Sequence, residues 1–144
     1  MKIAICGSLN FTEEILKIKE KLEARGHEIK LPKSITDFSL RNSTDADNLK
    51  ANRERYMKLK PSYTKEHFKK IADSDAVLIV NEGKHGIKNY IGGATFAEII
   101  LAFHYDKKIF LMNPIPTDEK LAVIRDEIEG VRPVVINGNL DLIK

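Results

Sequence analysis

Apolar positions along the chain alternate between short continuous runs and longer stretches in which they recur every three or four residues. The continuous runs predict β-strands, because strands inside a parallel sheet are short and apolar on both faces. The clearest run is Ala76-Val77-Leu78-Ile79-Val80, which contains no polar side chain. Strands are expected over residues 2–6, 27–31, 76–81, 108–112 and 134–136.

The stretches between these runs have the period of amphipathic helices. In the first stretch, Ile15, Ile18 and Leu22 fall on one helical face. Asn10 is placed to cap the start of this helix, and Gly26 is placed to end it. Helices are expected over residues 11–25, 62–73, 94–106 and 117–129.

This alternation of strands and helices predicts one α/β domain over residues 1–144, with helices on both faces of a parallel sheet. Right-handed crossovers leave few topologies, and the expected one is a five-stranded, flavodoxin-like (Rossmann-like) three-layer sandwich of order 2-1-3-4-5. In that order, ligands bind at the carboxyl ends of strands 1 and 3. The loops there are residues 7–11 and 81–93.

Residues 33–60 form a polar segment that fits this pattern poorly. A structureless loop of that length is uncommon in a compact domain. We therefore expect residues 45–59 to be helical, with one weak apolar face that includes Leu49 and Tyr56. The segment is either a solvated surface insertion or a lid over the ligand crevice.

Composition narrows the classes of function. Among 144 residues, 42% are hydrophobic and the net charge is only +3, with lysines and glutamates intermixed, so no nucleic-acid groove is indicated. No apolar run is long enough to span a membrane, and the N-terminal run is too short for a signal peptide. A single cysteine, Cys6, favours a reducing cytoplasmic setting.

Glu98 is the most informative candidate for chemistry. It is the only charged residue between Lys88 and Asp106, and it follows a glycine-rich loop that ends at Gly92-Gly93. Two interpretations compete. Glu98 could belong to a narrow solvent-facing stripe with Thr95, Ala102 and Asp106, or it could be an ionised carboxylate that faces the crevice and acts as a nucleophile.

Candidate ligand-binding residues lie in the two loops at the crevice. Glycine lets a ligand approach the backbone, and a helix start offers N–H donors to an anion. The spacing matches neither a dinucleotide fingerprint nor a P-loop, so a tight turn with an asparagine cap is the alternative. The expected binding residues are Gly7, Ser8, Asn10, Gly92, Gly93 and Thr95.

Other titratable residues are open to two interpretations. His67 is either a packing residue or a general acid that works near neutral pH. Cys6 is expected to be a small core residue, and Asp75 a cap or turn residue. None of the remaining histidines has a spacing that makes a zinc site with Cys6, so no metal is expected; they are His27, His85 and His104.

Several of these segments, taken in order, resemble the nucleoside 2-deoxyribosyltransferase superfamily, which includes deoxynucleoside 5'-monophosphate N-glycosidases. The resemblance is carried by Gly7-Ser8, the stretch over residues 71–80, the loop into Ala94-Thr95-Phe96-Ala97-Glu98-Ile99, and the tail over residues 130–139. It covers most of the chain outside residues 33–60.

The resemblance implies an activity on a nucleoside or nucleotide, without a cofactor. The glutamate at the position of Glu98 attacks C1' of the sugar, the base leaves, and water or a second base resolves the glycosyl-enzyme with retention. The turn at Gly7 and Ser8 corresponds to the site of a 5'-phosphate. The resemblance also implies a homo-oligomer, in which Ile124 or Arg125 lies near the position that contributes to a neighbouring site.

The chain departs from the family pattern at three places, one of which is a longer loop over residues 81–91. The family carries an aspartate where this chain has His67, and an acidic residue in the loop that here ends Ile91-Gly92-Gly93. A second hypothesis is therefore a nucleotide-binding or sensing module that keeps the crevice without the chemistry. A flavin-dependent electron carrier is disfavoured, because the first loop lacks a hydroxyl-rich phosphate cradle and the chain has no tryptophan.

Overall fold

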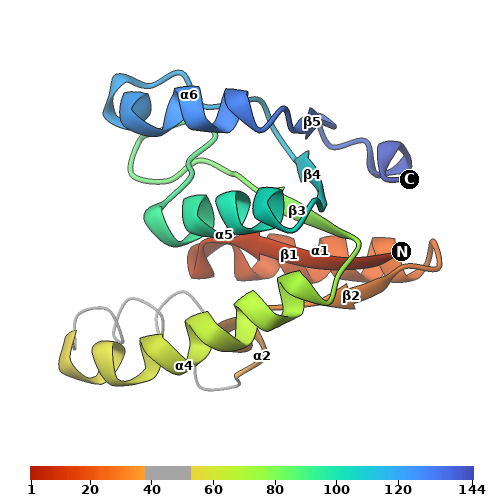
Figure 1. Ribbon diagram of the computed structural model, residues 1–144, viewed down its shortest axis with the longest axis horizontal. Coiled ribbons are helices and arrows are strands. Elements are labelled where there is room, and N and C mark those ends of the chain that lie inside the picture. Colours follow the sequence, from red (N-terminus) through yellow and green to blue (C-terminus); the bar gives the residue numbers. More distant parts are fainter. Residues whose placement is uncertain (38–52) are drawn as a thin grey trace.

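A computed structural model describes residues 1–37 and 53–144 of the chain (Figure 1). Five parallel strands form one sheet in the order β2-β1-β3-β4-β5. The strands are β1 (Lys2–Gly7), β2 (Glu28–Lys30), β3 (Ala76–Val80), β4 (Lys108–Leu111) and β5 (Val134–Val135). The flavodoxin-like fold and the strand order predicted from the sequence are confirmed, with strand ends that differ by at most one residue.

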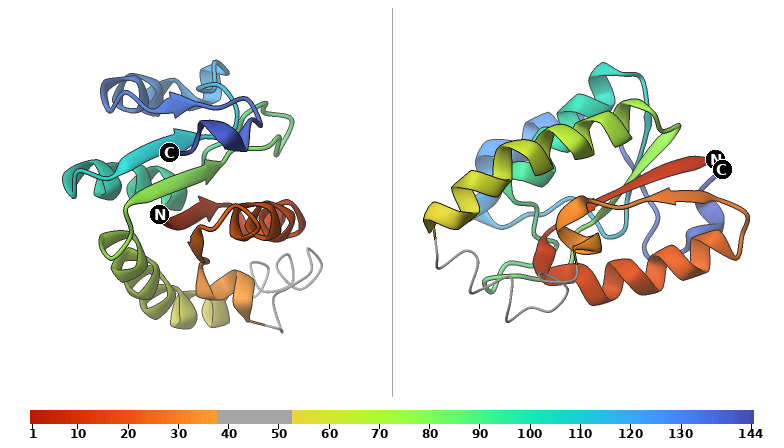
Figure 2. Two further views of the ribbon diagram at one scale, coloured as in Figure 1. Left: turned by 90° about the vertical axis from the view of Figure 1, so that its right-hand side faces the viewer. Right: turned by 90° about the horizontal axis from the view of Figure 1, so that it is seen from below.

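Helices cover both faces of the sheet (Figure 2). Besides short 3-10 turns, they are α1 (Thr12–Glu23), α2 (Lys33–Thr36), α4 (Arg53–Ala72), α5 (Gly93–His104) and α6 (Ala122–Gly130). The apolar faces of α1 and α2 pack with Ile3 and Ile5 of β1. The apolar faces of α4, α5 and α6 pack with Ala4 and Cys6 of the same strand. Because side chains alternate along β1, Cys6 points toward α4 and α5.

The start of α1 corrects one prediction. A 3-10 turn, η1 (Leu9–Phe11), precedes the helix, and Ser8 caps this turn by accepting a hydrogen bond from the Asn10 amide at 3.3 Å. Phe11 occupies the cap position of α1 and makes no side-chain cap bond. The prediction that Asn10 caps the helix is wrong, because the extended backbone at Ser8 enters the helical region two residues earlier than the apolar period suggests.

Helix α4 is longer than predicted. The sequence places a helix over residues 62–73 and a separate one over 45–59, but Arg53–Ala72 is one continuous helix with Pro61 inside it. Pro61 removes one backbone hydrogen bond, to the Met57 carbonyl, and its own position is exposed, so water can solvate that group. Residues 45–52, with Leu49, lie outside the described residues, and Tyr56 is half-buried.

Gly7 lets β1 and β3 approach closely at their carboxyl ends. It pairs with Val80, and a Cβ atom at Gly7 would lie 3.0 Å from the Val80 carbonyl oxygen and 3.4 Å from Cδ1 of Ile15. From the sequence, Gly7 is expected to let a ligand approach the backbone. The structure adds that Gly7 is also needed for the close packing of β1 on β3.

Among the described residues, no helix combines the length and the apolar character needed to cross a membrane.

Candidate functional site

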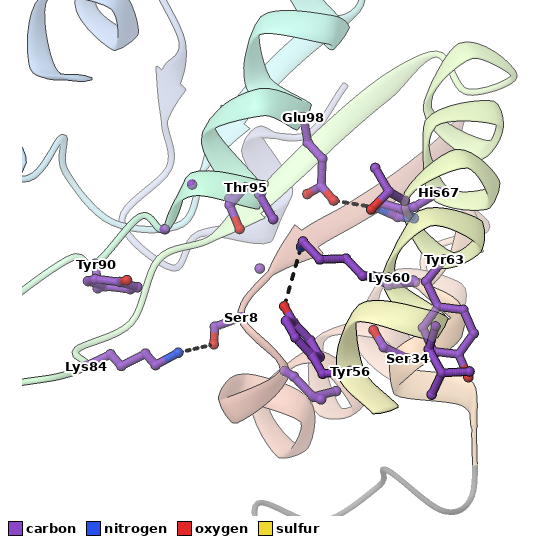
Figure 3. A pocket seen from close by; sticks show the side chains of 18 residues that line it. Ser8, Ser34, Tyr56, Lys60, Tyr63, His67, Lys84, Tyr90, Thr95 and Glu98 are labelled. Carbon is purple, nitrogen blue, oxygen red and sulfur yellow. Dashed lines mark hydrogen bonds and ion pairs between the residues drawn. The ribbon is translucent and has the colours of Figure 1, made fainter. Parts of the chain in front are cut away.

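A pocket of about 280 Å³ lies at the predicted place, beside the carboxyl ends of β1 and β3 (Figure 3). Its walls come from five segments: the turn after β1, the start of α2, the pocket-facing side of α4, the loop after β3, and the first turns of α5. The volume is near the lower end of the range of small-molecule sites, about 300–1,000 Å³. The pocket therefore suits one small ligand.

A tight turn in the loop after β3 places a lysine at the mouth of the pocket. Lys84 and Ile87 exchange two backbone hydrogen bonds, of 3.1 and 2.9 Å, across the pair His85-Gly86. Both central residues have positive φ, 55° and 72°, which is the geometry of a type I' turn. Lys84 Nζ donates a hydrogen bond of 2.8 Å to Ser8 Oγ, which joins the two loops that the sequence assigns to ligand binding.

The N-terminus of α5 forms the opposite wall. Gly92 is the cap residue and makes no side-chain cap bond, and Gly92, Gly93, Ala94 and Thr95 at this helix start all line the pocket. Thr95 is 6% exposed and Ala102, on the same side of the helix, is fully buried. The solvent-facing stripe considered for Glu98 is therefore wrong, since its neighbours on that face are buried.

Glu98 and His67 meet deep in the pocket, from α5 and α4 respectively (Figure 3). Glu98 Oε1 lies 4.0 Å from His67 Nε2, and their side chains are 14% and 2% exposed. Cys6 Sγ lies 3.5 Å from the same nitrogen and is fully buried. His67 Nδ1 is buried and has no hydrogen-bond partner among the described residues.

Burial sets the protonation of these three groups. Burial raises the pKa of Glu98 to about 7, against smaller opposing effects of a hydrogen bond from Cys6 and the charge of Lys60. Burial, followed by the charge of Lys70, lowers the pKa of His67 to about 4, although the Ile5 backbone favours the protonated ring. Burial, followed by the Glu98 charge, raises the pKa of Cys6 well above its ordinary value.

These protonation states limit what the cluster can do. At neutral pH His67 is neutral, Cys6 is a thiol, and Glu98 titrates. Cys6 and Glu98 both approach Nε2 of His67, whereas a nucleophilic triad needs its third member on the other ring nitrogen. A cysteine nucleophile activated by His67 does not fit this arrangement, and Glu98 is the group with a tunable charge.

Aromatic and cationic side chains complete the walls. Tyr56, Tyr63 and Tyr90 line the pocket, and Lys60 Nζ lies 3.4 Å from the Tyr56 hydroxyl and 5.4 Å from that ring's centroid. Lys84 Nζ lies 5.4 Å from the centroid of Tyr90. Sequence reasoning missed all of these side chains except Tyr56, which it assigned to a weak apolar face. The available signal was a tyrosine or lysine every three to four residues in 56–63.

Most of the site residues predicted from the sequence line the pocket, and one does not. Gly7, Ser8, Gly92, Gly93, Thr95, His67 and Glu98 all line the pocket. Asn10 is exposed and does not line it. Arg125 donates hydrogen bonds to the carbonyl oxygens of Pro116, Thr117 and Asp118, and Ile124 is half-buried against the core; their contribution to a neighbouring subunit's site stays a prediction.

Comparisons of the chain with protein-family models, with curated proteins and with solved structures find no match. The resemblance to nucleoside 2-deoxyribosyltransferases therefore rests on the residues quoted above, and the activity that it implies stays a proposal.

Proposed function

We propose that the protein cleaves or transfers the N-glycosidic bond of a nucleoside or nucleotide through a covalent intermediate on Glu98. The observation that carries this proposal is the position of the Glu98 carboxyl group, 14% exposed, at the inner end of the pocket beside the carboxyl ends of β1 and β3. It is the only carboxylate among the described residues that line the pocket.

The pocket suits the parts of a nucleoside. Tyrosine rings can stack on a planar base, as Tyr56 and Tyr90 are placed to do. A 5'-phosphate could bind Lys84 and the Ser8 hydroxyl at the mouth of the pocket, beside the start of α5, since a helix N-terminus favours an anion. The sugar would then lie between these ends, with C1' toward Glu98.

In the proposed first step, the ionised Glu98 oxygen bonds to C1' from the face opposite the base. The C1'–N bond breaks, the base departs with its electron pair, and it takes a proton from solvent. In the second step, water or another base attacks C1' and loses a proton to solvent, while the bond from C1' to the Glu98 oxygen breaks and frees the carboxylate; the two displacements together retain the configuration. Only the ionised form of Glu98 can begin this sequence.

His67 takes a positioning role in this proposal. Its use as a general acid stays a prediction. With a pKa near 4, His67 carries the proton that an acid must donate only at a pH far below neutrality. A neutral imidazole with Nε2 4.0 Å from the carboxyl group is too far for a direct hydrogen bond, so it would act by packing beside Glu98 and limiting the positions of that side chain.

The test is incubation with a panel of nucleosides and 5'-monophosphates, with free base and base exchange measured by chromatography. Glu98→Gln should lose at least about a thousandfold in rate, because the amide cannot form the ester. Intact-mass analysis of quenched parent enzyme should show one added glycosyl group, absent in the variant. Glu127→Gln, an exposed change on α6, is the matched control. A Glu98→Gln variant as fast as the parent would refute the mechanism.

The second candidate is a nucleotide-binding or sensing module that lacks the chemistry. It is favoured by His67, which stands where the resembled family has an aspartate, and by the raised pKa of Glu98, which leaves part of the carboxyl protonated at pH 7. Calorimetry separates the two candidates. Tight nucleotide binding with no base release from the parent over hours selects the module.

We also propose that the chain forms a homo-oligomer. The outer face of α5 exposes Ile100 at 37% and Phe103 at 54%, which favours contact with another copy. Light scattering at micromolar concentration would give the mass, and Phe103→Ser should lower it if this face is the interface.

A further inference from the structure

Three side chains with different metal-binding atoms converge at the inner end of the pocket. Cys6 comes from β1, His67 from α4 and Glu98 from α5, and one ligand atom from each lies within 4.8 Å of the others. Cys6 and His67 are 61 positions apart in the sequence, and Glu98 lies further along the chain. Their spacing along the chain matches no metal-binding motif, because the sheet and two helices bring the three residues together.

The two distances from His67 Nε2 are close to those between ligands of one zinc ion, and the Cys6 and Glu98 ligand atoms lie within 4.8 Å of each other. With Zn–S near 2.3 Å and Zn–N near 2.0 Å, two ligands of a tetrahedral ion lie about 3.5 Å apart. Cys6 Sγ and His67 Nε2 are separated by 3.5 Å. Glu98 Oε1 and the same nitrogen are separated by 4.0 Å, so a side-chain shift of about 0.7 Å brings the oxygen to the distance that zinc requires.

The charges also fit a divalent cation. A thiolate, a carboxylate and a neutral imidazole sum to two negative charges. The three side chains are at most 14% exposed, so a thiolate and a carboxylate there would lack compensation by solvent. A bound cation would compensate both negative charges at once. Lys60 acts on Glu98 and Lys70 acts on His67, so two nearby positive charges oppose the ion and limit its affinity.

The pocket supplies a route for the ion and a place for a fourth ligand. His67 and Glu98 line the cavity, while Cys6 lies behind them and is fully buried. An ion among the three would therefore meet protein on one side and the pocket on the other. Three protein ligands and one open position form the arrangement that zinc adopts where its bound water or substrate can exchange.

We propose that Cys6, His67 and Glu98 bind one thiophilic divalent transition-metal ion of the zinc class. Binding releases the thiol proton of Cys6 to solvent, together with the Glu98 proton where it is present. The sulfur and nitrogen ligands disfavour magnesium and calcium. Because the ion would occupy the Glu98 oxygen, it would inhibit the glycosidic reaction, and this consequence alone rests on the proposed function.

Cobalt(II) titration of the whole metal-free chain tests the site without any substrate. Cobalt bound to a thiolate absorbs in the near ultraviolet, and Cys6 is the only cysteine in the chain, so that absorption can come from no other residue. We expect the signal to saturate at one equivalent and to be displaced by zinc. Absence of the band in the parent protein would overturn the proposal. This outcome needs no Cys6 variant, so it does not depend on whether such a variant folds.

Ligand variants test the other two positions. His67→Gln and Glu98→Gln should each weaken cobalt binding by at least about tenfold, since losing even an outer-shell partner costs that much. His27→Gln is the control, because His27 Nδ1 lies 3.2 Å from the N-terminal amine and forms a separate potential metal pair. The thiolate band should persist in this control. Unchanged affinity in both ligand variants would refute the three-residue site.

Measuring base release with and without zinc separates the proposed metal site from the proposed glycosidic activity. If the chain releases base, stoichiometric zinc should abolish release and a chelator should restore it. If the chain has no glycosidic activity, the cobalt band still decides the metal site. Full activity with saturating zinc, alongside a thiolate band, would show that Glu98 is not a ligand and would also overturn the proposal.

Discussion

The carboxyl group of Glu98 lies 4.0 Å from Nε2 of His67, across the junction of α5 and α4, and neither group is more than 14% exposed. Burial moves their pKa values toward the uncharged forms, upward for Glu98 and downward for His67. The pair is therefore not a fixed ion pair at neutral pH. Its charge depends on whether Glu98 is ionised, and so does the chemistry proposed for the pocket.

Base release should rise with pH through about 7 in the presence of a chelator. Attack on C1' needs the ionised carboxylate, and the pKa of Glu98 is raised to about 7 by burial. The sequence alone predicts a loss above pH 7, on the assumption that His67 acts as an acid with an ordinary pKa. The pH profile of kcat/KM between 5 and 9 measures the free enzyme and separates these two expectations. A decline from pH 6 to 8 would contradict the nucleophile.

Lys60→Met should move that profile to higher pH. The Lys60 charge favours ionised Glu98, so its removal raises the pKa of the carboxyl group further. The same pH profile measures the shift. Lys65→Met, an exposed change on α4 outside the pocket, removes an equal charge and should leave the midpoint in place. Coincident profiles for parent and Lys60→Met would show that Lys60 does not act on the reacting group.

Glu98→Gln should stabilise the protein at pH 8 and have little effect near pH 4.5. In the unfolded chain the carboxyl group ionises near its ordinary pKa, whereas in the folded protein it ionises near 7. The unfolded state thus loses its proton first as the pH rises, and stability falls between about 4.5 and 7. The gain at pH 8 is at most about 3 kcal/mol. Urea unfolding at both pH values, with chelator and with Glu127→Gln as control, measures it.

Gly7→Ala should destabilise the protein by about 1–3 kcal/mol, the usual cost of overfilling a packed site. The new methyl group would lie 3.0 Å from the Val80 carbonyl oxygen, which belongs to the paired strand and cannot move alone. Gly130→Ala is the matched control, because a Cβ there meets nothing within 4 Å. Equal unfolding midpoints in urea for the two variants would contradict a packing role for Gly7.

The sheet could be predicted from sequence because its signal is local. The run from Ala76 to Val80 is apolar at every position, and all five side chains are buried. The crevice follows from strand order, so Ser8 and Glu98 could be assigned to it. Lys60 and Tyr56 could not be assigned to it, since they lie in a polar segment whose pattern is also that of a solvated insertion. In addition, α4 continues through Pro61 because solvent can reach that exposed helix face, which the sequence pattern does not indicate.

The contact between Cys6 and His67 could not be predicted from the sequence. These residues are 61 positions apart, and neither lies in a local motif that indicates the contact. Only the alternation of side chains along β1 sends Cys6 toward α4, and only the packing of α4 on that face brings His67 to it. Clusters assembled in this way depend on tertiary packing, which a pattern of apolar positions does not specify to within a hydrogen-bond length.

Lys84→Met should discriminate between a nucleoside and its 5'-monophosphate. Lys84 Nζ donates to Ser8 Oγ at the mouth of the pocket, which is also lined by the start of α5. A hydrogen bond to a charged group contributes about 1.5–3 kcal/mol, which corresponds to roughly a ten- to hundredfold loss of affinity for the monophosphate. Calorimetry on the Glu98→Gln background measures binding without turnover. Lys88→Met, exposed in the same loop and outside the pocket, is the control. An equal loss for nucleoside and monophosphate would place the phosphate elsewhere, because a lysine that binds phosphate has no partner on the unphosphorylated ligand.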